Sequence, residues 1–570
     1  MKLNLAAAFT FLASLWMPLH LLPWISWHNE VWTFVAVGLL VLASMTSSAE
    51  GLHQKQIGLP KAAWPILVLC FVSVVQVSTG AIGFLGDAVV INFYLALCVG
   101  ALIVGVDHGL RNSHSDAGAS YNNPNIEFFA MVVLLGGAGS AVIAFAQVFD
   151  VWPDAEWIVR MSEGARPGGN LAQPNQLATL ILFALASLVY LFEARRIAAL
   201  TTLALGLVLL LGLVITESRT GVLSFLLIVL WWVAKRRSIP FAMSGSAVAL
   251  STLFFLTCFW LFPGFANHLQ EGGASQATTI SVNTAVGTRV VIWPQLWQAV
   301  LMHPWFGWGL REVSTAHNAV LGGALTSEPF TYAHNILLDL AIGVGLPLAF
   351  VMAASVALWV WRRALNTSDI LGWYCLAFIL PLCVHSLLEF PFAYAYLLAP
   401  VLFIVGVMEA KNAVPGLVWI RLRVVALSLM LITAVMVWSV VEYVAIEEDF
   451  RVARFEALRI GHTPDDYERP HIVLLSQLDA LLDGARIVPA PLMERERIEL
   501  ARKVALRFPW PATQNRYALS LALNGNSEEA LRQINVMRAM HGPDAYARIK
   551  LQWETLAEEK YPQLRELKMP

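Results

Sequence analysis

The chain has 570 residues, of which 58% are hydrophobic and only 13% are charged, and its mean hydropathy is +0.64. This composition excludes an ordinary soluble enzyme and favours a polytopic helical membrane protein, because backbone polar groups in lipid must be satisfied within each helix. The net charge of −2 says little about partners, and we expect no nucleic-acid partner. The five cysteines all fall within apolar runs, which favours small core residues over disulfides or metal ligands.

Apolar runs long enough to cross a bilayer recur along residues 1–443. Counting runs of roughly 17 to 25 residues gives about thirteen, so the sequence predicts an all-α membrane protein with about 12 to 14 transmembrane helices. The runs begin near Asn4, Val31, Ala62, Ala88, Phe128, Asn175, Leu200, Thr220, Phe241, His334, Leu371, Tyr394 and Val424.

Basic residues in the short loops predict the orientation of these spans. By this count they all fall on one face, which the positive-inside rule makes cytoplasmic. They are Lys2, Lys61, Arg111, Arg195, Arg196, Lys235, Arg236, Arg237, Arg362, Arg363, Lys411, Arg421 and Arg423. The opposite face then carries the loop 151–174, the turn 217–219, a long insert at 263–333, the turn 389–392 and the tail after Tyr443.

The tail, residues 444–570, changes character and predicts a soluble helical domain beside the transmembrane domain 1–443. Charged residues become frequent, and apolar residues return at helical spacing. The segment 516–531 predicts a helix, a turn at Gly525 and a second helix capped by Asn526 and Glu529. This unit resembles a tetratricopeptide hairpin, although a single unit also fits a plain helical domain.

Arg219 is the first candidate for an anion site, because ionisable groups at membrane depth are functional candidates by default. It lies between two spans with almost no loop between them, where Ser218, Thr220 and Gly221 add hydroxyl and backbone donors. The alternative is a snorkelling arginine paired with Glu217. The cluster of donors favours an anion.

Two more arginines lie on the same predicted face. Arg289 precedes an expected interfacial helix, where contact with lipid headgroups is the alternative role. Arg166 precedes the loop 167–175, whose glycines allow close backbone approach and whose Gln173 and Asn175 supply donors. Three arginines from three loops can converge on a pyrophosphate, which guanidinium groups bind bidentately.

Histidines supply the candidates for acid–base chemistry. His334, followed by Asn335, opens an apolar run directly after the insert, and an ordinary neutral imidazole can take a hydroxyl proton. A satisfied interfacial histidine is the alternative. His385 and Glu389 would share one helix face, either as an acid–base pair or as a structural hydrogen bond. The dipeptide His317–Asn318 repeats the pattern inside the insert, but no span follows it.

Five segments together resemble the bacterial O-oligosaccharyltransferases that glycosylate pilins and other periplasmic proteins. This family is related to the O-antigen ligases and O-antigen polymerases. The segment Gly169–Ala178 is similar to the family's Gln-Pro-Asn loop. Three more segments resemble the core of the whole superfamily, namely Ser218–Gly221, Arg289–Gly309 and His334–Gly345. The segment His385–Tyr396 is similar to the end of the branch that carries a soluble C-terminal domain.

The resemblance implies an enzyme of the bacterial inner membrane whose active site faces the periplasm. Its donor would be an oligosaccharide on undecaprenyl pyrophosphate, transferred intact to a serine or threonine hydroxyl of a pilin-like or other periplasmic protein. We expect His334 to be the catalytic base of an inverting displacement. Arg219, Arg289 and Arg166 would bind the pyrophosphate, with support from Gln173, Asn175, Asn335, His385 and Glu389. No paired-carboxylate or other metal motif occurs in the sequence, so we expect neither a metal nor another cofactor.

One position departs from the family pattern. Many relatives carry an acidic residue two before the glycine of the His-Asn segment, and this chain has Gly343 there. If a carboxylate is needed, Asp339 or Glu389 would have to supply it.

Two other functions stay open on the sequence. A sibling enzyme could ligate O-antigen to lipid A core or polymerise repeat units, although the Gln-Pro-Asn loop and the tail argue against it. A lipid-linked glycan transporter should show inverted repeats and charged or broken helices at mid-membrane. No repeat is apparent, and the candidate charges cluster at one face.

Overall fold

The computed structural model describes residues 2–46, 56–110, 123–152, 154–162, 164–271, 284–321, 329–412 and 417–569. Arg111 and the parts 272–283 and 322–328 of the predicted insert lie outside the described residues. The described chain is mainly helical and divides into two compact units, which are treated separately below. Unit 1 comprises Met1–Leu67, Tyr94–Ser281 and Ser355–Thr433; unit 2 comprises Val68–Phe93, Val282–Ala354 and Ala434–Pro570.

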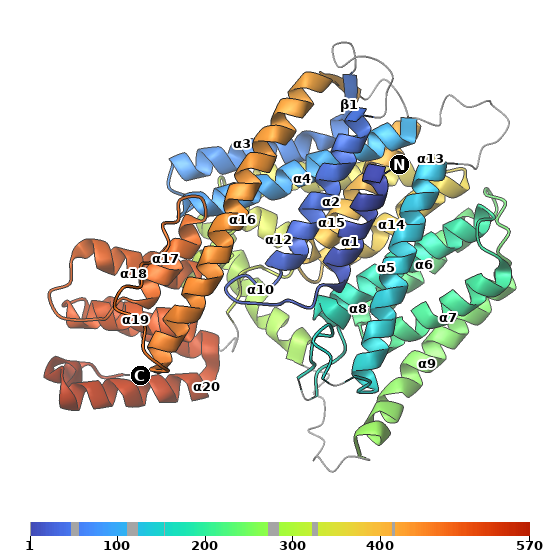
Figure 1. Ribbon diagram of the computed structural model, residues 1–570. Coiled ribbons are helices and arrows are strands. Elements are labelled where there is room, and N and C mark those ends of the chain that lie inside the picture. Colours follow the sequence, from blue (N-terminus) through green and yellow to red (C-terminus); the bar gives the residue numbers. More distant parts are fainter. Residues whose placement is uncertain are drawn as a thin grey trace. The chain divides into compact units, whose positions relative to one another are not determined.

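In the described parts of the chain, nine helices belong to unit 1 and four more are divided between the units. Unit 1 holds α1 (Lys2–Trp16), α2 (Trp27–Thr46), α5 (Pro124–Val148), α6 (Pro174–Glu193), α7 (Ala199–Ile215), α8 (Arg219–Lys235), α9 (Gly245–Glu271), α14 (Ile370–Ser386) and α15 (Ala395–Asn412), with short 3₁₀ turns η1 (Lys61–Ala63), η2 (Gly169–Leu171) and η3 (Pro391–Ala393) (Figure 1). The divided helices are α3 (Trp64–Ser78), α4 (Leu85–Leu110), α13 (Leu346–Asn366) and α16 (Leu422–Leu458).

Helix α6 forms the centre of unit 1. It is apolar on nearly every face and buried along most of its length, with α5, α7, α8 and α14 packed around it. Phe183 stacks on Phe378 of α14 with ring centroids 4.4 Å apart. Close approach of the helices depends on small residues: a Cβ atom added to Gly137 of α5 would lie 2.4 Å from the Cβ of Ala184. Substituting Gly137 would therefore push α5 away from α6.

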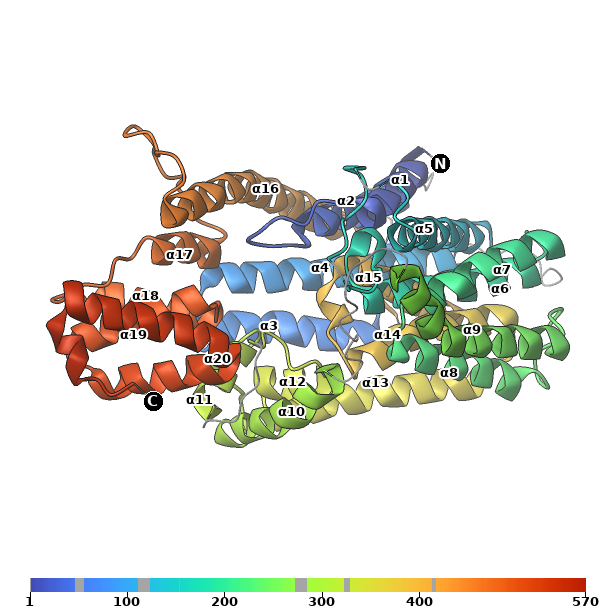
Figure 2. The same cartoon turned by 90° about the horizontal axis from the view of Figure 1, so that it is seen from below.

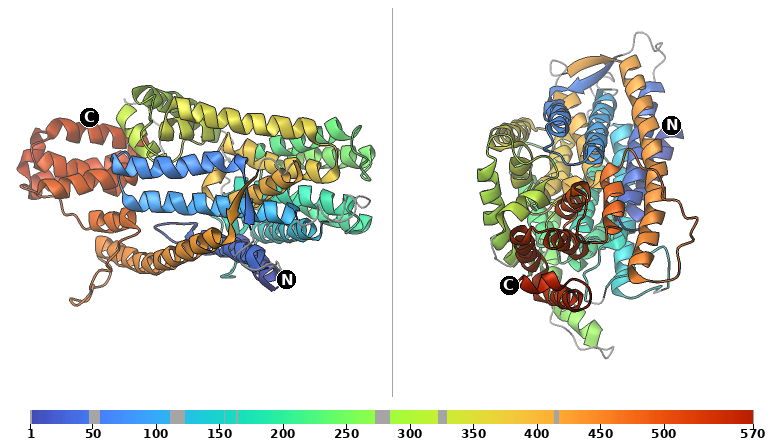
Figure 3. Two further views of the ribbon diagram at one scale, coloured as in Figure 1. Left: turned by 90° about the horizontal axis from the view of Figure 1, so that it is seen from above. Right: turned by 90° about the vertical axis from the view of Figure 1, so that its left-hand side faces the viewer.

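Unit 1 contains a two-stranded antiparallel ribbon that the sequence analysis did not predict. Strand β1 (Gln56–Pro60) pairs antiparallel with β2 (Leu417–Arg421), in a register that places Gly58 opposite Trp419 (Figure 3). Even the nearest partners in sequence, Pro60 and Leu417, are 357 positions apart, so local hydropathy carries no signal for the pairing.

Eight helices among the described residues are long and apolar enough to span a membrane, which confirms an all-α polytopic membrane protein. Three shorter apolar helices, α1, α7 and α14, add to them. The expectation that one span starts at His334 is wrong. The apolar run instead forms α12 (Ile336–Val344), broken by Gly345 at φ +80°, and then the spanning helix α13. Nine residues of α12 reach only about 14 Å at about 1.5 Å per residue, too short to cross.

Unit 2 contains the helices of the insert and of the tail. These are α10 (Thr284–Met302), α11 (Val313–Val320), α12, α17 (Ser476–Ala485), α18 (Arg495–Arg507), α19 (Pro511–Leu523) and α20 (Ser527–Glu559), followed by η5 (Pro562–Glu566). The predicted helix–turn–helix is confirmed. Gly525 ends the first helix at φ +83°, and the Asn526 side chain accepts a 3.4 Å hydrogen bond from the backbone N–H of Glu529. Helices α18, α19 and α20 lie side by side, and α20 bends at Gly542 (Figure 2).

Polar side chains join the tail to the rest of unit 2. Arg507 of α18 makes two hydrogen bonds of 2.7 and 2.8 Å to the buried carboxylate of Asp87. Arg532 and Gln533 of α20 donate to Asn318 of α11 at 3.2–3.3 Å. Breaking a buried charged pair by removing one partner costs about 3–5 kcal/mol. The tail is therefore built into unit 2 through Asp87 of α4 and Asn318 of α11.

Candidate active site

The N-terminal ends of α6 and α8 meet in unit 1. The Gln173 side chain caps α6 by accepting the backbone N–H of Gln176 at 2.8 Å, and Ser218 caps α8 by accepting that of Gly221 at 3.0 Å. Ser218 also donates from Oγ to Asn175 Oδ1 at 2.7 Å, which ties the two helix ends together. Each end carries the positive end of a helix dipole and backbone N–H groups without helical partners, so the pair favours a negatively charged ligand.

Hydrogen bonds to α1 and within the loop itself hold the loop before α6 in place. Asn170 donates from Nδ2 to the carbonyl oxygens of Trp16 and Trp157 at 2.7 and 2.8 Å. A Cβ atom added to Gly168 would lie 2.3 Å from the backbone nitrogen of Gln173. The predicted close backbone approach is therefore to the loop's own chain, and Gly168 lets the loop fold back onto the helix cap.

Arg166 and Arg219 lie on either side of the same turn. The half-buried Arg166 donates from Nη1 to the carbonyl oxygens of Glu217 at 3.1 Å and Thr216 at 3.4 Å. Burial raises the pKa of Glu217, and the positive charge of Arg166 opposes that shift. Arg219 is the first residue of α8 and is exposed. Unit 1 thus brings three predicted segments together: the Arg166 loop, the Gln-Pro-Asn loop and the Ser218–Gly221 turn.

His385 is buried against α6. Its Nδ1 lies 2.8 Å from the hydroxyl of Thr179, and its side chain is 1% exposed. One helical turn earlier on α6, Gln176 Oε1 accepts a 2.6 Å hydrogen bond from the hydroxyl of Tyr396. The expectation that His385 and Glu389 share one helix face is wrong, because α14 ends at Ser386. The Glu389 backbone N–H still bonds to the His385 carbonyl at 2.8 Å.

Glu30 belongs to this region and was missed by the sequence analysis. Its carboxylate, 2% exposed on α2, accepts the backbone N–H of Ala395 at the start of α15 at 2.7 Å. It therefore anchors the helix that carries Tyr396. An acidic residue inside an apolar run is the signal that would have found it.

The His334 segment lies in unit 2, at the start of α12. Asn335 caps α12 by accepting the backbone N–H groups of Leu337 and Leu338 at 2.9 and 3.2 Å. His334 is half-buried, has φ +53°, and meets the ring of Phe330 edge-on at 5.4 Å. The left-handed backbone turns the chain sharply between the insert and α12. His334 is therefore held on a tight turn.

Asp339 stabilises the His334 turn by hydrogen bonds to its backbone. Both of its carboxylate oxygens accept the backbone N–H of Ala333, at 3.1 and 3.2 Å. Burial raises the pKa of Asp339 to about 7, partly opposed by backbone hydrogen bonds from Ala333 and Asn335. Asp339, one of the two carboxylates expected to replace the missing acid at Gly343, contacts the His334 segment.

Glycines let the 304–309 segment pack closely against α12. Gly307 has φ +71°, and a Cβ there would lie 2.4 Å from the carbonyl oxygen of Ile342. The Trp308 backbone N–H donates to that oxygen at 2.7 Å. A Cβ at Gly343 would lie 3.1 Å from Leu310, so this position has little room for the carboxylate that many relatives carry.

Arg289 and His317 also lie in unit 2. Arg289 is half-buried on α10, the helix that packs against α12. His317 is buried beside Gln295 at 3.2 Å, and burial lowers the pKa of His317 to about 4. Its neighbour Asn318 is the residue bound by the tail. Both residues of His317–Asn318 thus make structural contacts within unit 2. The approach of Arg289 to Arg219 stays a prediction, because the two residues belong to different units.

Asp339 predicts a pH-dependent stability. Its pKa in the fold, about 7, is above the ordinary 3.8, so its stabilising contribution is complete below about pH 4 and is lost as the pH rises through 7. At about 1.36 kcal/mol per pKa unit, the full effect is on the order of 4 kcal/mol. An asparagine side chain at this position would mimic the neutral acid. We therefore expect Asp339→Asn to be close to the wild-type thermal midpoint at about pH 4 and to exceed it at about pH 8. An equal difference between the two proteins at both pH values would contradict this.

Comparisons with known proteins find three family matches and two relatives. Residues 167–192 match the family described as protein glycosylation ligase, residues 204–353 match O-antigen ligase, and residues 373–555 match virulence factor membrane-bound polymerase, C-terminal. The chain is 25% identical over 538 residues to the general O-oligosaccharyltransferase of Acinetobacter baylyi, covering 92% of this chain and 90% of the relative. It is 27% identical over 382 residues to the ComP-specific O-oligosaccharyltransferase of the same organism, covering 66% of each.

Proposed function

Because the chain belongs to the O-antigen ligase superfamily of membrane proteins, we infer that it is an oligosaccharyltransferase that transfers an oligosaccharide en bloc to protein. The match of residues 167–192 to protein glycosylation ligases favours a protein acceptor over a lipid acceptor. The same segment contains the Gln-Pro-Asn loop that caps α6. The donor in our proposal is an oligosaccharide on undecaprenyl pyrophosphate, and the acceptor is a Ser or Thr hydroxyl of a pilin-like or other periplasmic protein.

The observation that carries the donor assignment is the joined N-termini of α6 and α8. Backbone N–H groups at these helix ends, with Arg166 and Arg219 beside them, form a site suited to a pyrophosphate. Arg289 of unit 2 is proposed to bind the same pyrophosphate, and Arg166 is the third arginine of the proposal. A guanidinium group can hold two phosphate oxygens at once, which suits a leaving group that gains charge as it departs.

In the proposed mechanism, His334 takes the proton from the acceptor hydroxyl. The hydroxyl oxygen then forms a bond to the anomeric carbon of the first sugar, while the bond from that carbon to the pyrophosphate oxygen breaks. The electron pair of the broken bond stays on undecaprenyl pyrophosphate, which the arginines stabilise. Attack opposite the leaving group inverts the anomeric configuration. No metal takes part in this scheme. Asp339 acts as a positioning residue for the His334 turn.

The proposed location is the bacterial inner membrane, with the active site facing the periplasm. The support is the one-sided distribution of basic loops, which assigns the α6 and α8 N-termini and the tail to the non-cytoplasmic face. This is also the face on which a lipid-linked oligosaccharide would meet exported acceptor proteins.

Transfer in purified components tests this function. Full-length protein in liposomes, given an undecaprenyl-pyrophosphate-linked oligosaccharide, is expected to add the whole glycan to a pilin-like protein, read as one glycan mass per modified Ser or Thr. A parallel reaction receives lipid A core instead. Modification of lipid A core alone, or extension of the donor into longer repeats, would replace this function by O-antigen ligation or polymerisation. If the folded protein modifies neither acceptor, the proposed transferase function is rejected.

A further inference from the structure

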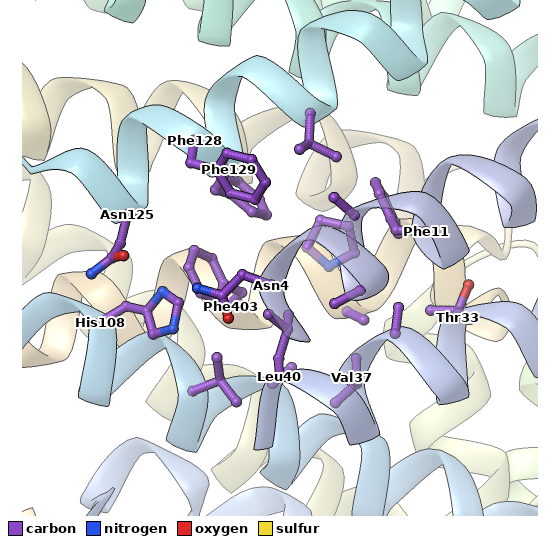
Figure 4. A pocket seen from close by; sticks show the side chains of 18 residues that line it. Asn4, Phe11, Thr33, Val37, Leu40, His108, Asn125, Phe128, Phe129 and Phe403 are labelled. Carbon is purple, nitrogen blue, oxygen red and sulfur yellow. The ribbon is translucent and has the colours of Figure 1, made fainter. Parts of the chain in front are cut away.

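Unit 1 contains an apolar cavity away from the residues discussed above. It has a volume of about 80 Å³ and lies between α1, α2, α5 and α15 and the part of α4 after Tyr94 (Figure 4). Alanines on four of these helices, Ala7, Ala36, Ala101 and Ala399, leave room beside the rings of Phe129 and Phe403. Small side chains at the meeting point of several helices account for the space.

Three of the four polar side chains that line the cavity lie at one side. Asn4, His108 and Asn125 lie together there, whereas Phe11, Val37 and Thr33 lie on the other side (Figure 4). Asn4 is near the start of α1, Asn125 is near the start of α5, and His108 is near the end of α4, so this side is one end of the helices. The buried Asn4 Oδ1 accepts no hydrogen bond from the described residues.

The surroundings determine what can enter. Apolar cavities stay dry and take up apolar guests instead. Three of the lining helices, α2, α4 and α5, are candidate membrane spans, so the medium beside the cavity is lipid hydrocarbon. Phe128 lines the cavity and is 37% exposed, so its side chain borders both the cavity and the outside of α5. At roughly 10–15 Å³ per water-sized group, the cavity takes about five to eight such groups, a segment of one chain.

We propose that this cavity binds one hydrocarbon chain of a membrane lipid, whose polar headgroup lies against Asn4, His108 and Asn125. The chain enters past Phe128 and fills the space beside the four alanines. Both sources of such a chain, a phospholipid acyl tail and a polyprenyl phosphate, share this chemistry. The polar end of the cavity is near Lys2, which is predicted to lie on the cytoplasmic side. The proposed donor site at the N-termini of α6 and α8 is predicted to lie on the opposite side, so the two sites are distinct.

The test measures lipid retention with a cavity-filling variant and a matched control. Ala36→Leu adds three carbons inside the cavity, whereas Ala6→Leu adds the same group on the exposed face of α1. The full chain is purified from phosphatidylethanolamine–phosphatidylglycerol vesicles and weighed intact by native mass spectrometry. We expect wild type and Ala6→Leu to retain one lipid, and Ala36→Leu to retain it at least about tenfold less. Equal retention by all three proteins would overturn the proposal.

A photoreactive phospholipid keeps the proposal testable if Ala36→Leu fails to fold. With a diazirine in its acyl chain, crosslinks in the wild-type protein are expected on peptides containing Phe11 or Phe128. Competition by excess phosphatidylethanolamine identifies an acyl tail, and competition by undecaprenyl phosphate identifies a polyprenyl chain; either result supports a hydrocarbon-chain site. Crosslinking spread evenly over the exposed faces of the helices, with none enriched at these peptides, would overturn it.

Discussion

Replacing His334 with alanine is expected to lower oligosaccharide transfer by about 10²- to 10⁴-fold, the usual contribution of a general base. The reason is positional. His334 lies half-buried on a left-handed turn that is fixed on one side by the Asn335 cap and on the other by Asp339. A side chain held in this way can meet an acceptor hydroxyl in one orientation. The loss should appear in turnover, while folding and binding of the lipid-linked donor persist.

The second His-Asn dipeptide provides a matched control. His317 is buried beside Gln295, and its neighbour Asn318 is bound by the tail. We expect His317→Ala to lower the thermal midpoint but to leave transfer per folded molecule near the wild-type value. Near-normal transfer by His334→Ala would remove His334 from the mechanism.

The anomeric configuration of the product gives an independent check on the base. A single base acting on the acceptor hydroxyl inverts the configuration of the donor sugar. Retention would call for a covalent intermediate on a carboxylate. Nuclear magnetic resonance of the glycopeptide distinguishes the two outcomes, and retention would contradict the role of His334.

Replacing Arg219 with lysine is expected to lower kcat/KM for the donor by about 10²- to 10³-fold, equal to roughly 2.7–4 kcal/mol for one lost donor on a developing anion. Arg219 is the first residue of α8, where its guanidinium adds to the positive helix end. Lysine keeps the charge but cannot make paired hydrogen bonds to two phosphate oxygens. Turnover should be measured at subsaturating donor, where loss of binding and loss of transition-state stabilisation both appear.

Arg237 at the opposite end of α8 is the matched control. It is exposed on the predicted cytoplasmic side, so Arg237→Lys should leave transfer unchanged. If Arg219 and Arg289 hold the same pyrophosphate, Arg289→Lys should lower kcat/KM similarly, and the double variant should depart from additivity. Wild-type turnover by both Arg219→Lys and Arg289→Lys would contradict the proposed anion site.

Arg166 is expected to differ from the other two arginines. Its guanidinium already donates to the carbonyl oxygens of Thr216 and Glu217, so it supports the turn before α8 as well as adding charge. The sequence analysis named Arg166 after Arg219 and Arg289, because only the neighbouring loop 167–175 supported a role for it. The structure gives it a second role, which is to hold the turn from which Arg219 projects.

The sequence by itself determined the class of protein and the helix cap at Asn526. Composition and run length identify a helical membrane protein, because the cost of unsatisfied backbone groups in lipid permits few alternatives. The cap at Asn526 was predicted because a cap joins residues two or three apart; the caps at Ser218 and Asn335 are equally local but were not predicted. The break at Gly345 was not predicted, because the apolar run has the same hydropathy before and after this short interruption.

Only the tertiary structure decided which of these segments meet. The hydrogen bonds from Ser218 to Asn175, from Tyr396 to Gln176, and between Thr179 and His385 join residues 43, 220 and 206 positions apart. Hydropathy cannot predict them, because a face packed on another helix and a face packed on lipid are equally apolar. For the same reason the cavity beside Ala36 left no trace in the sequence. Its alanines are ordinary helix residues until five helices bring them together.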